Sequence, residues 1–272
     1  MVKNFTKKKN KKSTGKKRKG IIKDVPLAKE KSRGSRASVG NIHYHYQDFS
    51  NTFRYFEILL KKNKRFRKLV CIPDISDSWM RGFLVQEFVK NDAHSYASIR
   101  PVDNNVHIGA FVKKIKECLK THQIIPVNFA IETGEYGKHA NMIILDSKYK
   151  TIEQFEPHGY HEDSQWSISR AYAKTGAGVI KFARKYFPDY TVISPKDYEP
   201  KNGLQGVIDA YGGMCVTWSI LYLNYRMLNP GTSSKALVQH INKTIKRVHL
   251  LKFTRYVELI LKKYPKFDLK VV

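Results

Sequence analysis

Apolar positions along this 272-residue chain recur at helical spacing in several stretches after about residue 50, and gather into short runs between some of them. Apolar residues three and four apart predict amphipathic helices, whereas short apolar runs bounded by polar turns predict strands. We therefore expect strands at residues 124–132, 139–145, 151–155 and 191–195. Helices are expected from about residue 51 to 70 and at residues 78–91, 106–123, 166–186 (interrupted near Gly176 and Gly178), 216–228, 233–248 and 249–264.

The second and third of these strands are joined by the polar stretch DSKYK, which predicts a β-hairpin. With the turn centred between Ser147 and Lys148, His139 and Glu156 would face each other at the open end of the hairpin. Opposed residues have Cβ atoms roughly 4.5–5.5 Å apart, so a carboxylate can bond an imidazole, fix its tautomer and stabilise its protonated form. A slip of one residue would turn Glu156 to the other face, and Glu153 is the alternative acid.

Cys215 follows two glycines and opens a long apolar run, VTWSILYLNYRML, which Asn229-Pro230-Gly231 ends. The pattern predicts a buried central helix with Cys215 in its first turn. There the unpaired backbone N–H groups and the positive end of the helix dipole favour a thiolate and can hold an oxyanion. The side-chain amide of Gln205, ten residues earlier, is a second candidate donor to that oxyanion.

Each of these residues has an ordinary structural interpretation when it is taken alone, because buried cysteines, hydrogen-bonded histidines and charges at strand ends are common. Taken together, His139, Glu156 and Cys215 match a base, the group that orients it and a thiol nucleophile. His158 is a competing base beyond the end of the strand. Trp218, one turn after the cysteine, is expected to pack in the core.

Two stretches, HANMIILDSKYKTIEQFEPHG and GGMCVTWSILYLNYRMLNP, resemble the adenain and ubiquitin-like-protein-protease superfamily, and more narrowly the Ulp-like cysteine peptidases of large DNA viruses. In that group His-x-Asn before an apolar strand, Phe-Glu-Pro-His-Gly and Cys-x-x-Trp-Ser recur. The resemblance covers roughly residues 125–232. Two features depart from it: the spacing from Gln205 to Cys215 is longer than usual, and Met214 stands where Tyr or Asp is more frequent.

The resemblance implies an α/β (α+β) fold, a papain-like core of adenain/Ulp type in which a small central mixed sheet is flanked by helices, with a helical N-terminal region. It implies that Cys215 is the nucleophile, His139 the base, Glu156 its orienter and Gln205 the oxyanion donor. The implied activity is a viral endopeptidase that cleaves virion precursor proteins after small residues such as Gly, in the virion or in the host cytoplasm or nucleus. Deconjugation of ubiquitin or a ubiquitin-like modifier is the alternative that uses the same residues.

The net charge of +27 is concentrated near the N-terminus, where residues 1–40 hold fifteen Lys or Arg against two acids. This stretch lacks apolar periodicity and predicts a disordered basic arm that binds nucleic acid or directs nuclear import. Residues 41–272 are then one cysteine peptidase domain, with a mainly helical part at 41–120, a catalytic core at 121–232 and C-terminal helices at 233–272. A basic virion protein that binds nucleic acid without catalysis is the alternative from a different class.

No apolar stretch approaches 18 residues, and the N-terminus is too charged for a signal peptide, so no membrane span or secretion is expected. Cys71 and Cys118 are expected to be core residues in a reducing compartment rather than parts of a disulfide framework. His43 and His45 could share one strand face and bind a metal, but a polar loop or strand edge is the favoured interpretation. The HGYHED stretch lacks the helical spacing of HExxH, so no metal cofactor is expected. We expect a monomer with precursor polypeptides as substrates, and the resemblance makes DNA a candidate activator.

Overall fold

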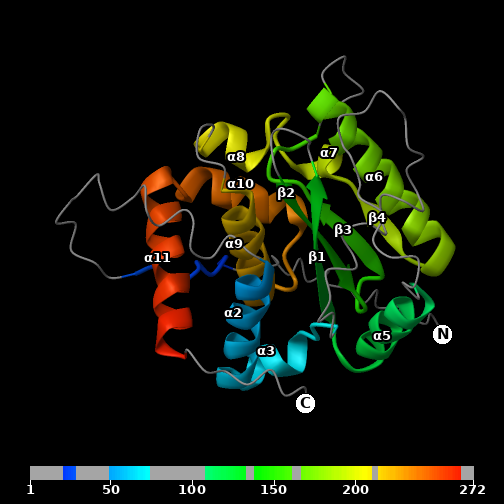
Figure 1. Ribbon diagram of the computed structural model, residues 1–272, viewed down its shortest axis with the longest axis horizontal. Helices are drawn as coiled ribbons and strands as arrows, with labels where there is room; N and C mark the ends of the chain where they lie inside the picture. The colour runs from blue at the N-terminus through cyan, green and yellow to red at the C-terminus, as the bar shows by residue number, and fades with distance from the viewer. Residues whose placement is uncertain are drawn as a thin grey trace, which may run out of the picture.

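The computed structural model describes residues 21–28, 49–73, 108–132, 138–160, 167–209 and 214–264 (Figure 1). Its helices are α2 (Phe49–Lys62), α3 (Lys64–Leu69), α5 (Ile108–Thr121), α6 (Ser167–Tyr186), α7 (Pro195–Tyr198), α8 (Gly203–Ile208), α9 (Cys215–Leu228), α10 (Ser234–Thr244) and α11 (Arg247–Lys263). Its strands are β1 (Ile124–Glu132), β2 (Lys138–Asp146), β3 (Thr151–Phe155) and β4 (Thr191–Ile193). The helix expected at residues 78–91 lies outside the described residues.

The strands form one mixed sheet in the order β1-β2-β3-β4. β2 pairs antiparallel with β1 and β3, whereas β3 pairs parallel with β4. Helix α9 packs against β2 and β1, while α5 contacts β1 and α6 contacts β3 and β4 from the other side (Figure 1). This arrangement confirms the expected α/β class, in which a small mixed sheet is flanked by helices.

Alternate residues of β2 face two separate hydrophobic cores. Met142 and Ile144 belong to a cluster with α9, while Ile143 and Leu145 belong to a second cluster with α5 and α6. Nearly every residue of α9 is buried, as expected of an apolar helix in the middle of a domain. Cys215 opens this helix, so the packing of α9 on the sheet decides where its sulfur lies.

The β2–β3 hairpin has a different register from the one expected. Asp146 pairs with Thr151, so the turn is centred between Lys148 and Tyr149, one residue later than predicted. The Asp146 side chain accepts hydrogen bonds from the backbone N–H groups of both turn residues, at 2.9 and 3.1 Å, which stabilises this turn. Every cross-strand partner therefore moves by two positions. Because side chains alternate along a strand, this shift keeps each residue on the expected face.

Three element predictions differ from the structure. The helix expected from residue 51 to 70 is broken at Asn63, whose side-chain oxygen accepts hydrogen bonds from backbone N–H groups in the first turn of α3. Conversely, α6 continues through Gly176 and Gly178, because packing of its apolar face on the sheet outweighs a cost of about 1 kcal/mol per glycine. The segment that carries Gln205, expected as a loop, forms the short helices α7 and α8.

Part of the predicted disordered arm packs against the body of the protein. Residues 21–28 have no regular secondary structure, but Val25 is buried in the same hydrophobic cluster as α9 and α11. The backbone of Lys23 exchanges two hydrogen bonds with the side chain of Asn229, at 2.7 and 2.9 Å. The prediction of disorder is therefore wrong for these residues, and the rest of the arm lies outside the described residues.

Cys71 and Cys118 are joined by a disulfide, with their Cα atoms 5.6 Å apart. The bond links the segment after α3 to α5, and beside it the backbone N–H of Cys71 donates to the carbonyl of Ile124 at 3.1 Å. The expectation of two separate core cysteines is therefore wrong. These residues are 47 positions apart, and only the packing of α3, β1 and α5 brings them together. Cys215 remains a free thiol.

Candidate active site

His139 and Glu156 lie on the same face at the open end of the β2–β3 hairpin. Extending the observed register by one pair places Glu156 opposite Asn141, so His139 and Glu156 are diagonal neighbours rather than directly opposed. Diagonal side chains on one face of a sheet remain within reach of each other. The two groups are buried and hydrogen bonded, with 2.5 Å between His139 Nε2 and Glu156 Oε1. The structure therefore brings this pair together despite the shift in register.

Cys215 is the first residue of α9, as the sequence pattern predicted. Its sulfur accepts a hydrogen bond from the backbone N–H of Ala140 at 3.3 Å and is hydrogen bonded to the His139 side chain. Because Nε2 of His139 is engaged by Glu156, Nδ1 is the ring nitrogen left for the sulfur. Cys215 is 7% exposed, so it is nearly enclosed but retains some contact with solvent. Cys215, His139 and Glu156 thus form one chain of hydrogen bonds.

Interactions within this series of hydrogen bonds shift the pKa values of Cys215 and His139 in opposite directions. Burial disfavours the imidazolium, but the Glu156 carboxylate and the Cys215 sulfur outweigh it and raise the pKa of His139 to about 10. Burial also disfavours the thiolate, but hydrogen bonding and attraction by His139 lower the pKa of Cys215 below its ordinary value. The positive end of the α9 dipole favours negative charge at the same place. Both shifts therefore favour the thiolate–imidazolium pair.

Gln205 lies on α8, next to the turn that follows β3. Its backbone N–H donates to the carbonyl of Pro157 at 2.9 Å, one residue after Glu156. Its side chain is buried, and its Oε1 accepts no hydrogen bond among the described residues. Helix α8 also contacts α9, which Cys215 opens. The structure thus anchors Gln205 beside the turn at Glu156. Its Oε1 makes no hydrogen bond to any of the other three predicted site residues.

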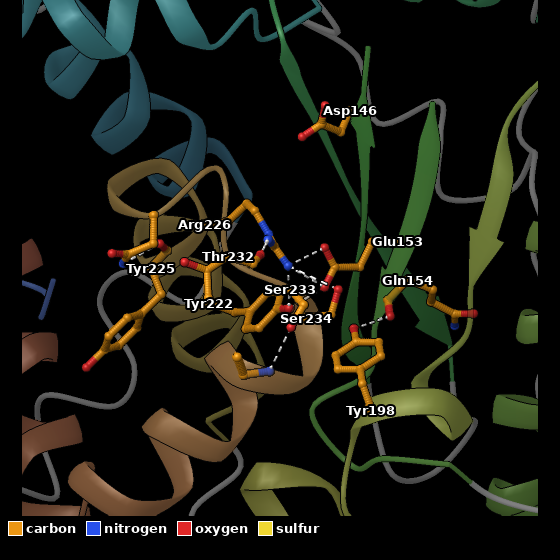
Figure 2. Close-up of polar contacts among 12 residues, drawn as sticks. Asp146, Glu153, Gln154, Tyr198, Tyr222, Tyr225, Arg226, Thr232, Ser233 and Ser234 are labelled. Atoms are coloured by element: carbon orange, nitrogen blue, oxygen red, sulfur yellow. Dashed lines mark hydrogen bonds and ion pairs between the residues drawn. The ribbon is translucent and has the colours of Figure 1, made fainter. Parts of the chain in front are cut away.

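Glu153, the alternative acid, lies on the opposite face of β3. Arg226 Nη2 contacts its carboxylate at 2.7 Å (Oε2) and 2.9 Å (Oε1), and the Tyr222 hydroxyl also donates to it (Figure 2). These partners come from the second half of α9, away from the cysteine at its start. Glu153 therefore does not contact His139 and cannot orient it.

His158, the alternative base, lies beside the site. Its ring packs against that of His139, with 4.7 Å between the ring centroids. Its backbone N–H donates to Glu156 Oε1 at 2.9 Å. Since His139 is the imidazole that bonds the Cys215 sulfur, His158 is a neighbour of the pair rather than its base.

Sequence reasoning gave no role to two residues that the structure adds to this network. Asn141 Nδ2 donates to Glu156 Oε2, and Gln154 Nε2 donates to Asn141 Oδ1 at 3.3 Å. The alternation of β2 contained a signal, because Asn141 lies two positions after His139 and therefore on the same face. The expected register would place Gln154 directly opposite Asn141, and the observed one makes it a diagonal neighbour on the same face, so the hairpin pattern also contained a signal for this contact.

Among the described residues, no group of three or more His, Cys, Asp or Glu side chains could hold a metal ion. The histidines at 43 and 45 and the segment 161–163 lie outside those residues. Within the same part of the chain, no helix combines the length and the apolar character needed to cross a membrane.

No protein-family model matches this chain. It is 27% identical over 142 residues to the putative ankyrin repeat protein L371 of Acanthamoeba polyphaga mimivirus, a match that covers 43% of this chain and only 18% of that protein's length.

Among solved structures, the chain is similar to ChlaDub1 from Chlamydia trachomatis, with a TM-score of 0.44 and 13% identity over 84% of this chain and 94% of that one. A second structure, of the Chlamydia trachomatis effector protein ChlaDUB1, gives a TM-score of 0.45 and 12% identity over 85% and 90% of the two chains. A third structure, of the Chlamydia trachomatis effector protein Cdu1 bound to ubiquitin, gives a TM-score of 0.42 and 13% identity, and the match covers 79% of this chain and 92% of that one. At these levels of likeness, none of the matches assigns the chain to a family.

Proposed function

We propose that the protein is a cysteine peptidase in which Cys215 is the nucleophile, His139 the base and Glu156 the group that orients the base. The observation that carries the proposal is the buried chain of hydrogen bonds from Cys215 through His139 to Glu156. A small buried cysteine needs no such partners for packing, whereas a thiol nucleophile needs a base and an orienter in this order.

In the proposed reaction the Cys215 thiolate attacks the carbonyl carbon of a peptide bond. The resulting oxyanion is held by backbone N–H groups at the start of α9, with the Gln205 amide as the proposed second donor. His139 gives its proton to the leaving nitrogen, the C–N bond breaks, and an acyl group remains on sulfur as a thioester. His139 then takes a proton from water, the hydroxide attacks the thioester, and the carboxylic acid leaves as the thiolate is restored.

The motif resemblance supports a finer proposal, in which the substrates are virion precursor proteins cut after small residues such as Gly. The similarity over 142 residues to a mimivirus protein agrees with an origin in a large DNA virus. In this proposal the enzyme acts as a monomer in the virion or in the infected cell, and residues 1–40 contact DNA that serves as an activator. A protease that removes ubiquitin-like modifiers would use the same residues, so substrate profiling separates the two activities.

The test is cleavage by the full chain, kept reduced, of two kinds of fluorogenic substrate. One kind is a panel of peptide amides with Gly, Ala or Leu before the scissile bond, and the other is ubiquitin and related modifiers with a C-terminal fluorogenic amide. Each is assayed with and without duplex DNA. We expect cleavage by the wild type, and a loss of roughly 10³-fold or more in Cys215→Ala and His139→Ala.

The matched control is Ser219→Ala, one turn further along α9. The buried Ser219 hydroxyl has no hydrogen-bond partner within the described part of the chain, so its removal is expected to leave turnover unchanged. Activity that survives in Cys215→Ala would refute the proposal. So would the absence of cleavage of every substrate with DNA present, and nucleic-acid binding without catalysis would then be the better account.

A further inference from the structure

The Glu156 carboxylate is held at both of its oxygens. Oε1 accepts hydrogen bonds from His139 Nε2, at 2.5 Å, and from the backbone N–H of His158, at 2.9 Å. Oε2 accepts one from the side-chain amide of Asn141. Glu156 is 2% exposed, so protein groups rather than bulk water set the orientation of its carboxylate.

Asn141 is itself held by a second amide. Gln154 Nε2 donates to Asn141 Oδ1 at 3.3 Å. Because its oxygen is engaged, the Asn141 amide presents its nitrogen to Glu156. The chain from Gln154 through Asn141 to Glu156 therefore has one direction, and only this direction supplies a donor to the carboxylate.

The side chains of Gln154, Asn141 and Glu156 lie on the face of the hairpin that is turned away from Arg226. Figure 2 shows Glu153 and Gln154 pointing to opposite sides of β3. Asn141 and Gln154 are both buried, and Gln154 Oε1 would lie 3.6 Å from a Cβ placed on Gly176 of α6, so this helix covers the far end of the chain. Two buried amides are costly unless both are hydrogen bonded. Apolar side chains would fill these positions without that requirement.

We propose that Asn141 and Gln154 are positioning residues, which hold the Glu156 carboxylate toward His139. The inference rests on the proposed peptidase function and deepens it. A carboxylate held toward the imidazole favours the imidazolium that pairs with the thiolate. Both residues act through Glu156 rather than on the reacting atoms.

The titratable groups around this carboxylate come from four elements: His139 from β2, His158 from the turn after β3, Glu199 from the segment after α7, and Cys215 from α9. Glu199 Oε1 accepts a hydrogen bond from the backbone N–H of Glu156 at 3.1 Å. Burial raises the pKa of Glu199 well above its ordinary value and so favours its neutral form. His158 contacts both Glu156 and His139, so each variant is compared in the wild-type and His158→Gln backgrounds.

The test is the rate of Cys215 alkylation by iodoacetamide between pH 4 and 10, followed by intact mass and peptide mapping. Asn141→Leu keeps the size of the side chain but removes the donor to Glu156. We expect the midpoint of the low-pH phase to move up by about one pH unit, because a charge-assisted hydrogen bond is lost. Gln154→Met is expected to move it in the same direction by less. The double variant is expected to move it no further than Asn141→Leu, since both residues act through one bond.

Asn224→Leu is the matched control. Asn224 is a buried residue of α9 with two side-chain hydrogen bonds, from the Tyr55 hydroxyl at 3.2 Å and to the Ile220 carbonyl at 2.8 Å. It is expected to lower the melting temperature without moving the alkylation midpoint. A low-pH phase that is present in the wild type and unshifted in Asn141→Leu and Gln154→Met would overturn this inference alone. The absence of a low-pH phase in the wild type would overturn the peptidase proposal as well.

Discussion

The backbones of Gly159 and Gly203 lie so close together that neither residue has room for a Cβ atom. A Cβ on Gly159 would lie 2.2 Å from the nitrogen of Gly203, and a Cβ on Gly203 would lie 2.2 Å from the nitrogen of Gly159. Both residues have positive φ angles, 78° and 61°, which glycine adopts without strain. The contact holds the turn that begins at Glu156 against the helix that carries Gln205. It therefore sets the distance between two of the proposed catalytic groups.

We expect Gly159→Ala and Gly203→Ala each to lower the free energy of unfolding by about 3 kcal/mol or more. Each substitution combines a strained φ with a backbone clash that moves α8. Urea denaturation measures the first effect, and kcat at a temperature where the variants stay folded measures the displacement of Gln205. Gly231→Ala is the control, because among the described residues its added Cβ would meet only the Tyr149 hydroxyl oxygen, at 3.6 Å. If Gly203→Ala matched this control in stability and kcat, the contact would not position α8.

The pH range of activity follows from the opposite pKa shifts of Cys215 and His139. The thiolate forms above the lowered pKa of Cys215. The imidazolium, although burial opposes it, persists up to about pH 10 because of Glu156 and the sulfur. We expect kcat/KM to rise at a pH below the ordinary thiol value of about 8.5 and to fall as the pH passes about 10.

Glu156→Gln tests the cause of this range. Removing the carboxylate charge lowers the pKa of His139, so the falling limb is expected to move to lower pH while Ser219→Ala leaves it in place. A falling limb that stays at about pH 10 in Glu156→Gln would mean that another group protonates the leaving nitrogen.

The buried ion pair between Glu153 and Arg226 is expected to contribute to stability and not to catalysis. Arg226 also donates to the Thr232 carbonyl at 2.5 Å and to the Ser234 hydroxyl at 3.1 Å, so it ties β3 to the loop after α9 and to the start of α10 (Figure 2). Arg226→Met leaves a buried carboxylate without its partner and is expected to lower the free energy of unfolding by about 3–5 kcal/mol. Glu153→Gln is expected to destabilise the fold in the same way.

In both variants the pH dependence of Cys215 alkylation should match that of the wild type, measured on the folded protein. A shifted alkylation midpoint in Glu153→Gln would restore Glu153 as a candidate for the orienting acid. The double variant Glu153→Leu/Arg226→Met is expected to recover part of the lost stability, because no unpaired buried charge remains.

Residues 21–28 are expected to stabilise the domain although they lie within a strongly basic region. A chain that lacks residues 1–28 loses the buried Val25 and the two hydrogen bonds between Lys23 and Asn229. We expect it to be less stable by about 2–4 kcal/mol, as measured by thermal or urea unfolding. Deletion of residues 1–20 alone is the control and should leave the melting temperature unchanged. Equal stability of the two truncated chains would show that the segment does not dock in solution.

The local parts of the candidate site could be predicted from the sequence. Side-chain alternation placed His139 and Glu156 on one face, and this prediction survived the error in register because a shift of two positions preserves the face. The start of α9 at Cys215 followed from the glycines and the apolar run on either side of it. Helix α8 could not be predicted in this way. It has six residues and depends on its contact with the turn at Gly159 rather than on its own propensity.

The sequence by itself therefore determined the order of most helices and strands, the faces that they bury, and the types of residue gathered at the open end of one hairpin. Only the tertiary structure decided that Glu153 is bound by Arg226, that Cys71 meets Cys118, and that residues 21–28 return to α9. The physical reason is that periodicity belongs to the backbone geometry of a single element. Which elements meet depends instead on packing between segments that are distant along the chain.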